Sequence, residues 1–529
     1  MLLRQPDFLT LFTDAADEKS SDAKAWCELK DDVLKVYVAS QSTGVKHVRL
    51  EWRFTSAERR RDAVKVLGDC WERGYGDLQW APICPQTRYP WTVCVSNGSD
   101  GDKNTAGRFT ECFGVKARPG AMVTWQYEQG GVTLNLDTRS GGVGVVLGGR
   151  TLTAAEVKFG EYKNMSAFAA VKAYYKTLCD DAIFPSETVY GSNNWYYAYG
   201  KSDRKQIIRD AALIAELCPD YTPRPFMVID AGWTAPGCIG EEKPVPDKYY
   251  GDMKTLAQEI ASYNVKPGIW VRYLADEAKM LKEIPDEWRL SRDKRALDPS
   301  HPGVLEFIKE ATRIITYDWG YKLIKHDFSN VDVFGLWGFQ AESFMPDGGI
   351  VREEGWKLFR SDLTTAEVFE NMYKTIYEAA LPGTVIIGCN VAGFLSAGYC
   401  HINRTGDDTS GIEWERTRRM GVNTVAFRNM YDGTFYKADC DCVGVKGLIP
   451  WNLNKKWAQL ISYSGTPLFF STDPDVPSEN EKQFISECLK RGSEDTHTAV
   501  PLDWMETTCP EKWLLDGEEV TFDWSERAE

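Results

Sequence analysis

The chain has 529 residues, of which 43% are hydrophobic and 26% charged, which predicts either several packed domains or one large barrel with additions. The formal net charge is −15, and no long run of lysine and arginine occurs, which argues against nucleic-acid binding. No stretch reaches the roughly 18 apolar residues of a membrane-spanning helix, and the first residues lack a signal-peptide pattern. We therefore expect a cytoplasmic protein without membrane or nucleic-acid partners, or a secreted or periplasmic one if a signal peptide was removed.

Cysteine and histidine content argues against a metal centre. Fourteen cysteines in a chain of this length do not make a disulfide framework, and five histidines are few for a histidine-based metal site. Cys440 and Cys442 lie in ADCDC without a second cysteine pair nearby. We expect neither a metal nor an organic cofactor.

Residues 1–183 are predicted to form an antiparallel β-sandwich. Their β-branched and aromatic residues alternate with polar ones, and Gly- and Asn-rich turns separate the runs. The predicted strands are 33–40, 47–54, 91–96, 122–128 and 131–138. One helical pattern, SAERRRDAVKVLGDCWER at about 56–73, interrupts them.

From residue 184 to 492, short apolar strands alternate with amphipathic helices, which predicts a parallel sheet covered on both faces. The predicted strand segments are 189–200, 226–233, 266–274, 321–328, 384–390, 401–408, 435–441 and 466–472. The predicted helices are 202–218 (with Ser202 or Asp203 as N-cap), 252–264, 303–318, 361–381, 451–465 and 478–492. About eight such units favour a (β/α)8 TIM barrel. Residues 329–360 are predicted to be a long functional loop, and 493–529 a short β-rich tail.

Charged residues end several predicted barrel strands, and TIM-barrel active sites lie at these carboxyl ends. They follow the second, fourth, sixth and seventh strands: Asp230, Lys325, Asp327, Arg404, Asp407, Asp408, Asp439 and Asp441. If the strand count is right, Asp230, Asp327 and Asp408 come from even-numbered strands and converge at one mouth.

The stretch YKLIKHDFSN places Lys325 and Asp327 on the same face of a strand, with His326 on the other. At a barrel mouth the ammonium of Lys325 would keep Asp327 ionised, as a nucleophile or charge stabiliser. Only one of Asp407 and Asp408 can face inward there. Two such carboxylates suit retaining glycoside hydrolysis.

Each of these residues also has a structural interpretation. Asp327 could be the salt-bridge partner of Lys325, Asp408 could cap a loop, and Asp230 could be a turn residue. His326 is expected to be a packed core histidine.

Seven segments in order resemble the retaining α-galactosidase and α-N-acetylgalactosaminidase clan, the melibiase-like glycoside hydrolase families 27 and 36. The segments are GSNNWYYAYG, VIDAGW, KPGIWVRYL, LIKHDF, IIGCN, NRTGDD and TPLFFSTDP. The resemblance covers about 187–475, and a preceding β-sandwich is similar to the family 36 layout.

The resemblance implies roles residue by residue. Asp327 would be the nucleophile, and the Arg-x-x-x-Asp pattern from Arg404 selects Asp408 over Asp407 as acid/base. Asp230 and Lys325 would hold sugar hydroxyls. The other residues expected to contact substrate are Arg404, Trp195, Trp233, Trp270, Arg272, Cys389 and Asn390.

Three departures from the clan pattern bear on the substrate. Ala231 stands where relatives carry a second acidic residue that helps to read the axial 4-hydroxyl. Small residues at 389–393 are associated in family 27 with room for an N-acetyl group, and the glycine triplet common in family 36 is absent. Arg272 suggests an acidic or modified sugar, unless it forms a structural ion pair.

The expected function is a retaining exo-α-glycosidase that hydrolyses terminal α-linked galactose from oligosaccharides or glycoconjugates. The alternatives are an α-N-acetylgalactosaminidase, a raffinose-synthase-like transglycosylase, and a catalytically inactive carbohydrate-binding barrel. The expected partner is a carbohydrate substrate, and a homo-oligomer is possible.

Overall fold

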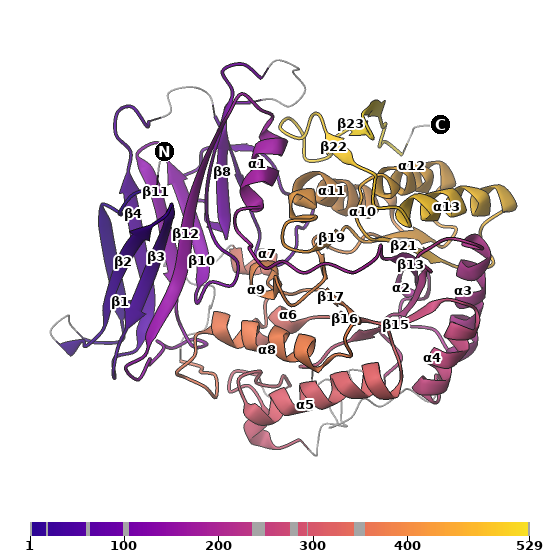
Figure 1. Cartoon of the computed structure of the whole chain (residues 1–529), viewed down its shortest axis with the longest axis horizontal. Coiled ribbons are helices and arrows are strands. Elements are labelled where there is room, and N and C mark those ends of the chain that lie inside the picture. Colours follow the sequence, from indigo (N-terminus) through magenta and orange to yellow (C-terminus); the bar gives the residue numbers. More distant parts are fainter. Residues whose placement is uncertain are drawn as a thin grey trace.

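The computed structural model describes residues 3–16, 20–59, 64–98, 105–234, 249–275, 284–293, 295–342 and 355–526. Two antiparallel sheets from the first part of the chain stand beside a β/α barrel, and a small sheet near the C-terminus packs on the barrel (Figure 1). The predicted combination of an amino-terminal sandwich and a TIM barrel is confirmed.

The sandwich consists of a five-stranded and a seven-stranded sheet. The first has the order β1 (Phe8–Thr13), β4 (Val45–Arg53), β11 (Gly131–Asp137), β10 (Met122–Glu128), β7 (Tyr89–Pro90). The second has the order β2 (Lys24–Lys30), β3 (Val33–Ala39), β12 (Thr151–Lys163), β9 (Phe109–Val115), β8 (Thr92–Ser96), β5 (Lys65–Gly68), β6 (Ala81–Pro82). Between the sheets, Phe159 makes edge-on ring contacts with Trp52, Phe113 and Trp125.

The helix predicted over 56–73 is wrong in the part that the structure describes. Residues 65–68 form β5, which pairs antiparallel with β8. Val66 and Leu67 are buried, and a short apolar run of this kind is compatible with a strand or a helix. Because β8 offers a free edge to pair with, the segment forms a strand. A helix that the sequence did not predict, α1 (Ala167–Tyr175), follows β12.

Parallel strands form the barrel. They are β13 (Tyr190–Asn193), β14 (Phe226–Ile229), β15 (Lys266–Val271), β16 (Leu323–His326), β17 (Val385–Gly388), β18 (Ile402–Arg404), β19 (Lys437–Asp439), β20 (Cys442–Val445) and β21 (Leu468–Thr472). β19 pairs with β18, whereas β20 pairs with β21, which also pairs with β13. Only Cys440 and Asp441 separate β19 from β20, and Asp441 has a φ of 81°. The seventh strand is therefore broken, and its two halves close the cylinder.

Helices surround the barrel (Figure 1). The longer ones are α3 (Arg204–Leu217), α4 (Met253–Ser262), α5 (Pro302–Arg313), α8 (Thr365–Ala379), α12 (Trp451–Ser462) and α13 (Glu479–Gly492). The short ones are α2 (Trp195–Ala198), α6 (Ser329–Phe334), α7 (Gly338–Glu342), α9 (Gly393–Ser396), α10 (Trp414–Thr417) and α11 (Asn423–Arg428), with single turns at Asp286–Trp288, Ile314–Asp318, Arg418–Val422 and Asn429–Tyr431. Asp203 caps α3 by accepting from the Gln206 amide at 2.8 Å, which decides between the two predicted caps. Within the described ranges, no helix combines the length and apolar character needed to cross a bilayer.

Two further predictions concern the ends of the barrel region. The segment predicted as a long loop, 329–360, begins with the helices α6 and α7, and its residues 343–354 lie outside the described ranges. The tail forms a three-stranded antiparallel sheet of β22 (Ala499–Pro501), β23 (Lys512–Leu515) and β24 (Glu518–Thr521). The boundaries at 183/184 and 492/493 stay predictions.

One loop of the amino-terminal sandwich, residues 69–76, lies against the barrel. Its Gly74 amide donates to Thr405 O at 2.9 Å, and the Asp407 amide donates to Gly74 O at 2.8 Å. Asp69 forms a buried ion pair with Arg428 and accepts a hydrogen bond from the Tyr431 hydroxyl. The 69–76 segment is thus fixed beside the carboxyl end of β18.

The Asp69–Arg428 pair predicts a large stability effect. Replacing Asp69 by alanine should lower the free energy of unfolding by about 3–5 kcal/mol, because it leaves the guanidinium of Arg428 buried without its carboxylate. Guanidinium chloride denaturation followed by tryptophan fluorescence measures this loss. Lys309→Ala, which removes an exposed ion pair with Glu306, is the control and should change stability little. Equal effects of both substitutions would contradict a role of the pair in docking the segment.

Candidate active site

Asp327 follows β16 directly, and three donors hold its carboxylate. The indole Nε1 of Trp270 donates to Oδ2 at 2.8 Å, while the Phe328 amide and Asn390 Nδ2 donate to Oδ1 at 2.7 and 2.6 Å. Asp327 itself is buried. These bonds fix the orientation of the carboxylate and leave Oδ2 with a single donor.

Lys325 shares its strand face with Leu323, which belongs to a buried cluster with Val228 and Ile387. The ammonium of Lys325 lies 2.7 Å from Asp230 Oδ2. Burial opposes the charge of Lys325, but the Asp230 carboxylate outweighs it and raises the pKa of Lys325 well above its usual value. The strand therefore carries a buried charge because a partner from the second strand neutralises it.

His326 points to the opposite side, where the rings of Tyr273 and Tyr373 lie 5.6 and 5.8 Å from its own. Burial lowers its pKa to about 4, so the imidazole is neutral near pH 7. It occupies the core, as predicted.

Asp408 lies between two arginines. Arg404 Nη2 and Arg73 Nη1 donate to its Oδ1 at 3.1 and 3.3 Å, and its side chain is 36% exposed. Burial raises the pKa of Asp408, but Arg404, Arg73 and Lys325 together lower it to about 2. The neighbouring Asp407 instead pairs with Arg73 at 2.7 Å and with Arg416 at 2.8 Å.

Asp441, at the break in the seventh strand, holds the segment after Asp408. Its Oδ2 accepts from the Thr409 amide at 2.7 Å, from the Thr409 hydroxyl at 2.8 Å and from the Tyr196 hydroxyl, and pairs with Arg404 at 2.6 Å. Sequence reasoning placed Asp441 at a strand end but did not include it in the site.

The ends of the fourth, fifth and sixth strands converge. Lys325 interacts electrostatically with both Asp327 and Asp408. Cys389, at the end of β17, has Asp327, Lys325 and two arginines around it, and burial raises its pKa well above the usual value, so the thiol is neutral. Asp327 and Asp408 therefore share one end of the barrel with Lys325, Arg404 and Arg73, whose other carboxylate partners are Asp230, Asp441 and Asp407.

Arg73 and Glu72 were not predicted to belong to this site. Both lie in the 69–76 segment, and the Arg73 side chain is 5% exposed, with its guanidinium 5.7 Å from the ring centres of Tyr75 and Trp337. Glu72 accepts from Asn330 Nδ2 at 3.2 Å and from the Gly338 amide at 3.0 Å. Nothing in the local sequence ERGY indicates these contacts.

Trp233 is a correction to the predicted sugar contacts. Its side chain has no exposed surface, its Nε1 donates to Trp270 O at 2.8 Å, and its ring packs edge-on against Trp319. Gly232, with a φ of 109°, precedes it in the turn after Asp230. In this structure Trp233 therefore contacts Trp270 and Trp319 and has no surface open to the mouth.

Arg272 and Trp195 lie near the strand ends, with different surroundings. Arg272 pairs with the buried Asp332 at 2.6 Å, which matches the ion-pair alternative, and its guanidinium lies over the Phe328 ring. Trp195 is half-buried at the start of α2, with its ring 5.8 Å from that of Tyr199. A sugar contact of Trp195 stays a prediction.

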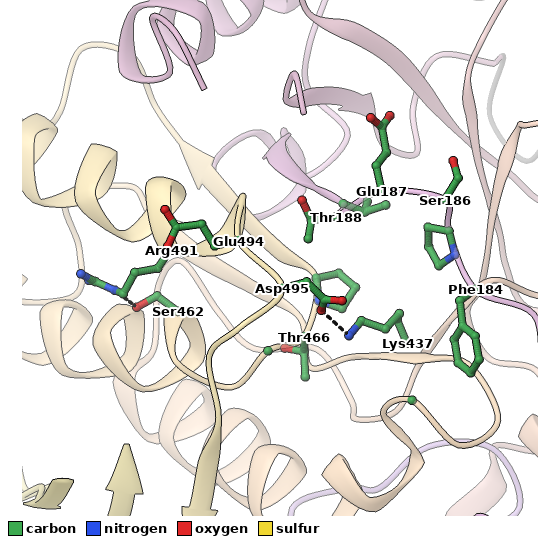
Figure 2. Close-up of a pocket in the computed structure, with 16 residues that line it drawn as sticks. Phe184, Ser186, Glu187, Thr188, Lys437, Ser462, Thr466, Arg491, Glu494 and Asp495 are labelled. Carbon is green, nitrogen blue, oxygen red and sulfur yellow. Dashed lines mark hydrogen bonds and ion pairs between the residues drawn. The ribbon is translucent and has the colours of Figure 1, made fainter. Parts of the chain in front are cut away.

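A separate cavity of about 460 Å³ lies at the opposite, amino-terminal ends of β13, β19 and β21 (Figure 2). Its cation Lys437 pairs with Asp495 at 3.2 Å, and Arg491 donates to the Ser462 hydroxyl at 3.0 Å (Figure 2). None of the predicted site residues lines it. In the part of the chain that the structure describes, no three His, Cys, Asp or Glu side chains are grouped as ligands for a metal ion.

No protein-family model matches the sequence, and a search of curated proteins finds no relative. Solved structures do match. An α-galactosidase from Thermus thermophilus, in complex with p-nitrophenyl α-D-galactopyranoside, is 15% identical with a TM-score of 0.61, over 94% of this chain and 96% of that one.

Two larger enzymes are also similar. The family 36 α-galactosidase AgaA from Geobacillus stearothermophilus is 12% identical with a TM-score of 0.57, over 92% of this chain and 73% of that one. The galactosidase domain of an α-galactosidase–sucrose kinase is 15% identical with a TM-score of 0.54, over 92% and 71%. The chain therefore has the fold of the family 36 α-galactosidases.

Proposed function

We propose that this protein is a retaining exo-α-glycosidase that hydrolyses terminal α-linked galactose by double displacement. The observation that carries the proposal is the pair Asp327 and Asp408, which end alternate strands at one end of the barrel and share Lys325 as a neighbour. Paired carboxylates are the machinery of most glycosidases. The fold shared with family 36 α-galactosidases supports the same choice.

In the first step, Asp327 Oδ2 attacks the anomeric carbon and the bond to the leaving oxygen breaks. Oδ2 is the better candidate because it accepts one hydrogen bond, whereas Oδ1 accepts two. Asp408 in its protonated form gives its proton to the leaving oxygen, which departs as an alcohol. In the second step, Asp408 takes a proton from water, and the resulting hydroxide displaces Asp327 from the sugar.

The sugar preference rests on fewer contacts. Asp230 and Lys325 would hold hydroxyls, while Ala231 supplies no carboxylate. An α-N-acetylgalactosaminide is the second candidate, because the small residues Ala392 and Gly393 lie two and three residues after Asn390, which contacts Asp327.

A panel of aryl α-galactoside, α-N-acetylgalactosaminide and α-glucoside tests the proposal. We expect the galactoside to react fastest and the α-anomer of the sugar to appear first in the proton NMR spectrum. A β-anomer as first product would exclude the nucleophilic role of Asp327. Inert behaviour of the folded protein towards all three would favour a carbohydrate-binding barrel.

A further inference from the structure

Arg73 reaches the acid/base from outside the barrel. It lies in the sandwich loop between β5 and β6, and its backbone neighbours on both sides are fixed: Gly74 bridges to the end of β18, and Glu72 accepts from Asn330 and Gly338. The buried guanidinium, flanked by the rings of Tyr75 and Trp337, has little freedom to leave.

The two steps of the reaction make opposite demands on Asp408. It must be protonated to release the first alcohol and ionised to accept a proton from water. The cations that face it are Arg404 on β18, Arg73 on the 69–76 segment, Lys325 on β16 and, beyond Asp407, Arg416 on α10. The other titratable groups around the same cations are Asp407, Asp441, Asp230, Asp327, Asp439, Tyr196, Tyr75 and Cys389.

We propose that Arg73 is a positioning residue that keeps Asp408 ionised in the resting enzyme and so makes protonation of the leaving oxygen the limiting event for sugar aglycones. The inference rests on the proposed function, in which Asp408 is the acid/base. It assigns to the amino-terminal sandwich a direct influence on catalysis, because the sandwich supplies the cation.

Substitutions at Arg73 and at Asp407 should shift the pKa of Asp408 in opposite directions. Asp407 competes with Asp408 for the guanidinium of Arg73. Arg73 Nη2 lies 2.7 Å from Asp407 Oδ1, whereas Arg73 Nη1 lies 3.3 Å from Asp408 Oδ1. Arg73→Gln removes a cation, so the pKa of Asp408 should rise by about 1–3 units and the group should be protonated at higher pH. Asp407→Asn removes a competing anion, so the pKa of Asp408 should fall.

Carbodiimide labelling at Asp408, located by tandem mass spectrometry and followed against pH, measures its protonated fraction without requiring activity. At pH 5 we expect Arg73→Gln to increase labelling about tenfold or more, since each pKa unit is tenfold in the protonated form. Arg73→Lys should stay near wild type, and Asp407→Asn should fall below it. Arg118→Gln, which removes another cation between sandwich and barrel, is the matched control and should change nothing.

Kinetics provide the second measurement. Arg73→Gln should reduce the difference in kcat/KM between substrates with aryl and with sugar leaving groups. It should also move the alkaline limb of the pH profile of kcat/KM to higher pH. Unchanged labelling in Arg73→Gln, or increased labelling in Asp407→Asn, would overturn the inference; if Arg73→Gln does not fold, the Asp407→Asn result decides. If Arg73→Gln increases labelling of Asp408 but the protein hydrolyses no glycoside, the influence of Arg73 on Asp408 stands and only the proposed function is contradicted.

Discussion

Asp327→Ala is expected to lower kcat by about 10⁴-fold or more without unfolding the protein, because it removes the carboxylate proposed to form the glycosyl-enzyme bond. The substitution leaves the donors of Trp270, Phe328 and Asn390 beside a vacated space at the mouth. Azide that enters this space can attack the anomeric carbon from the face that Asp327 used. An activated aryl galactoside should then yield the β-galactosyl azide.

The control for this experiment is a second buried aspartate at the other end of the barrel. Asp432 pairs with Lys437 at 3.2 Å and accepts from the Ala438 amide at 3.0 Å, a bond that an asparagine oxygen can also accept. Asp432→Asn should keep wild-type turnover. Normal turnover in Asp327→Ala, or an α-azide as product, would end the assignment of Asp327 as nucleophile.

Local rules explain why much of this site could be predicted. Lys325 and Asp327 share a strand face because side chains two residues apart do so in any strand. Arg404 and Asp408 are only four residues apart, so the short β18 and the turn after it bring the two side chains together. The caps of α3, α8 and α13 likewise depend on residues within one helical turn.

Other features depend on contacts between distant parts of the chain. Arg73 lies 335 residues before Asp408, so no spacing or periodicity connects them. The strand β5 forms where a helix was predicted because β8 offers a partner edge, which no local pattern reveals. Trp233 matches its motif by position, yet the turn at Gly232 and the ring of Trp319 place it in the core.

Asp408→Ala is expected to affect substrates differently according to their leaving group. Activity on sugar aglycones should fall about 10²–10⁴-fold, because they depart only with a proton, whereas activated aryl galactosides should still form the glycosyl-enzyme. The fold should hold, since Arg404 keeps Asp441 and Arg73 keeps Asp407 as ion-pair partners.

The second step of the reaction, hydrolysis of the glycosyl-enzyme, should be impaired in Asp408→Ala for every substrate. Water would lack its base, so the glycosyl-enzyme should accumulate and be observed as a mass increase of one hexose on the peptide that contains Asp327. Azide needs no base and should restore turnover through attack on that intermediate, giving the α-galactosyl azide. Opposite azide anomers from Asp327→Ala and Asp408→Ala would follow only if one carboxylate bonds to the sugar while the other exchanges protons. An equal loss on both classes of leaving group, or a β-azide from Asp408→Ala, would show that Asp408 is not the acid/base.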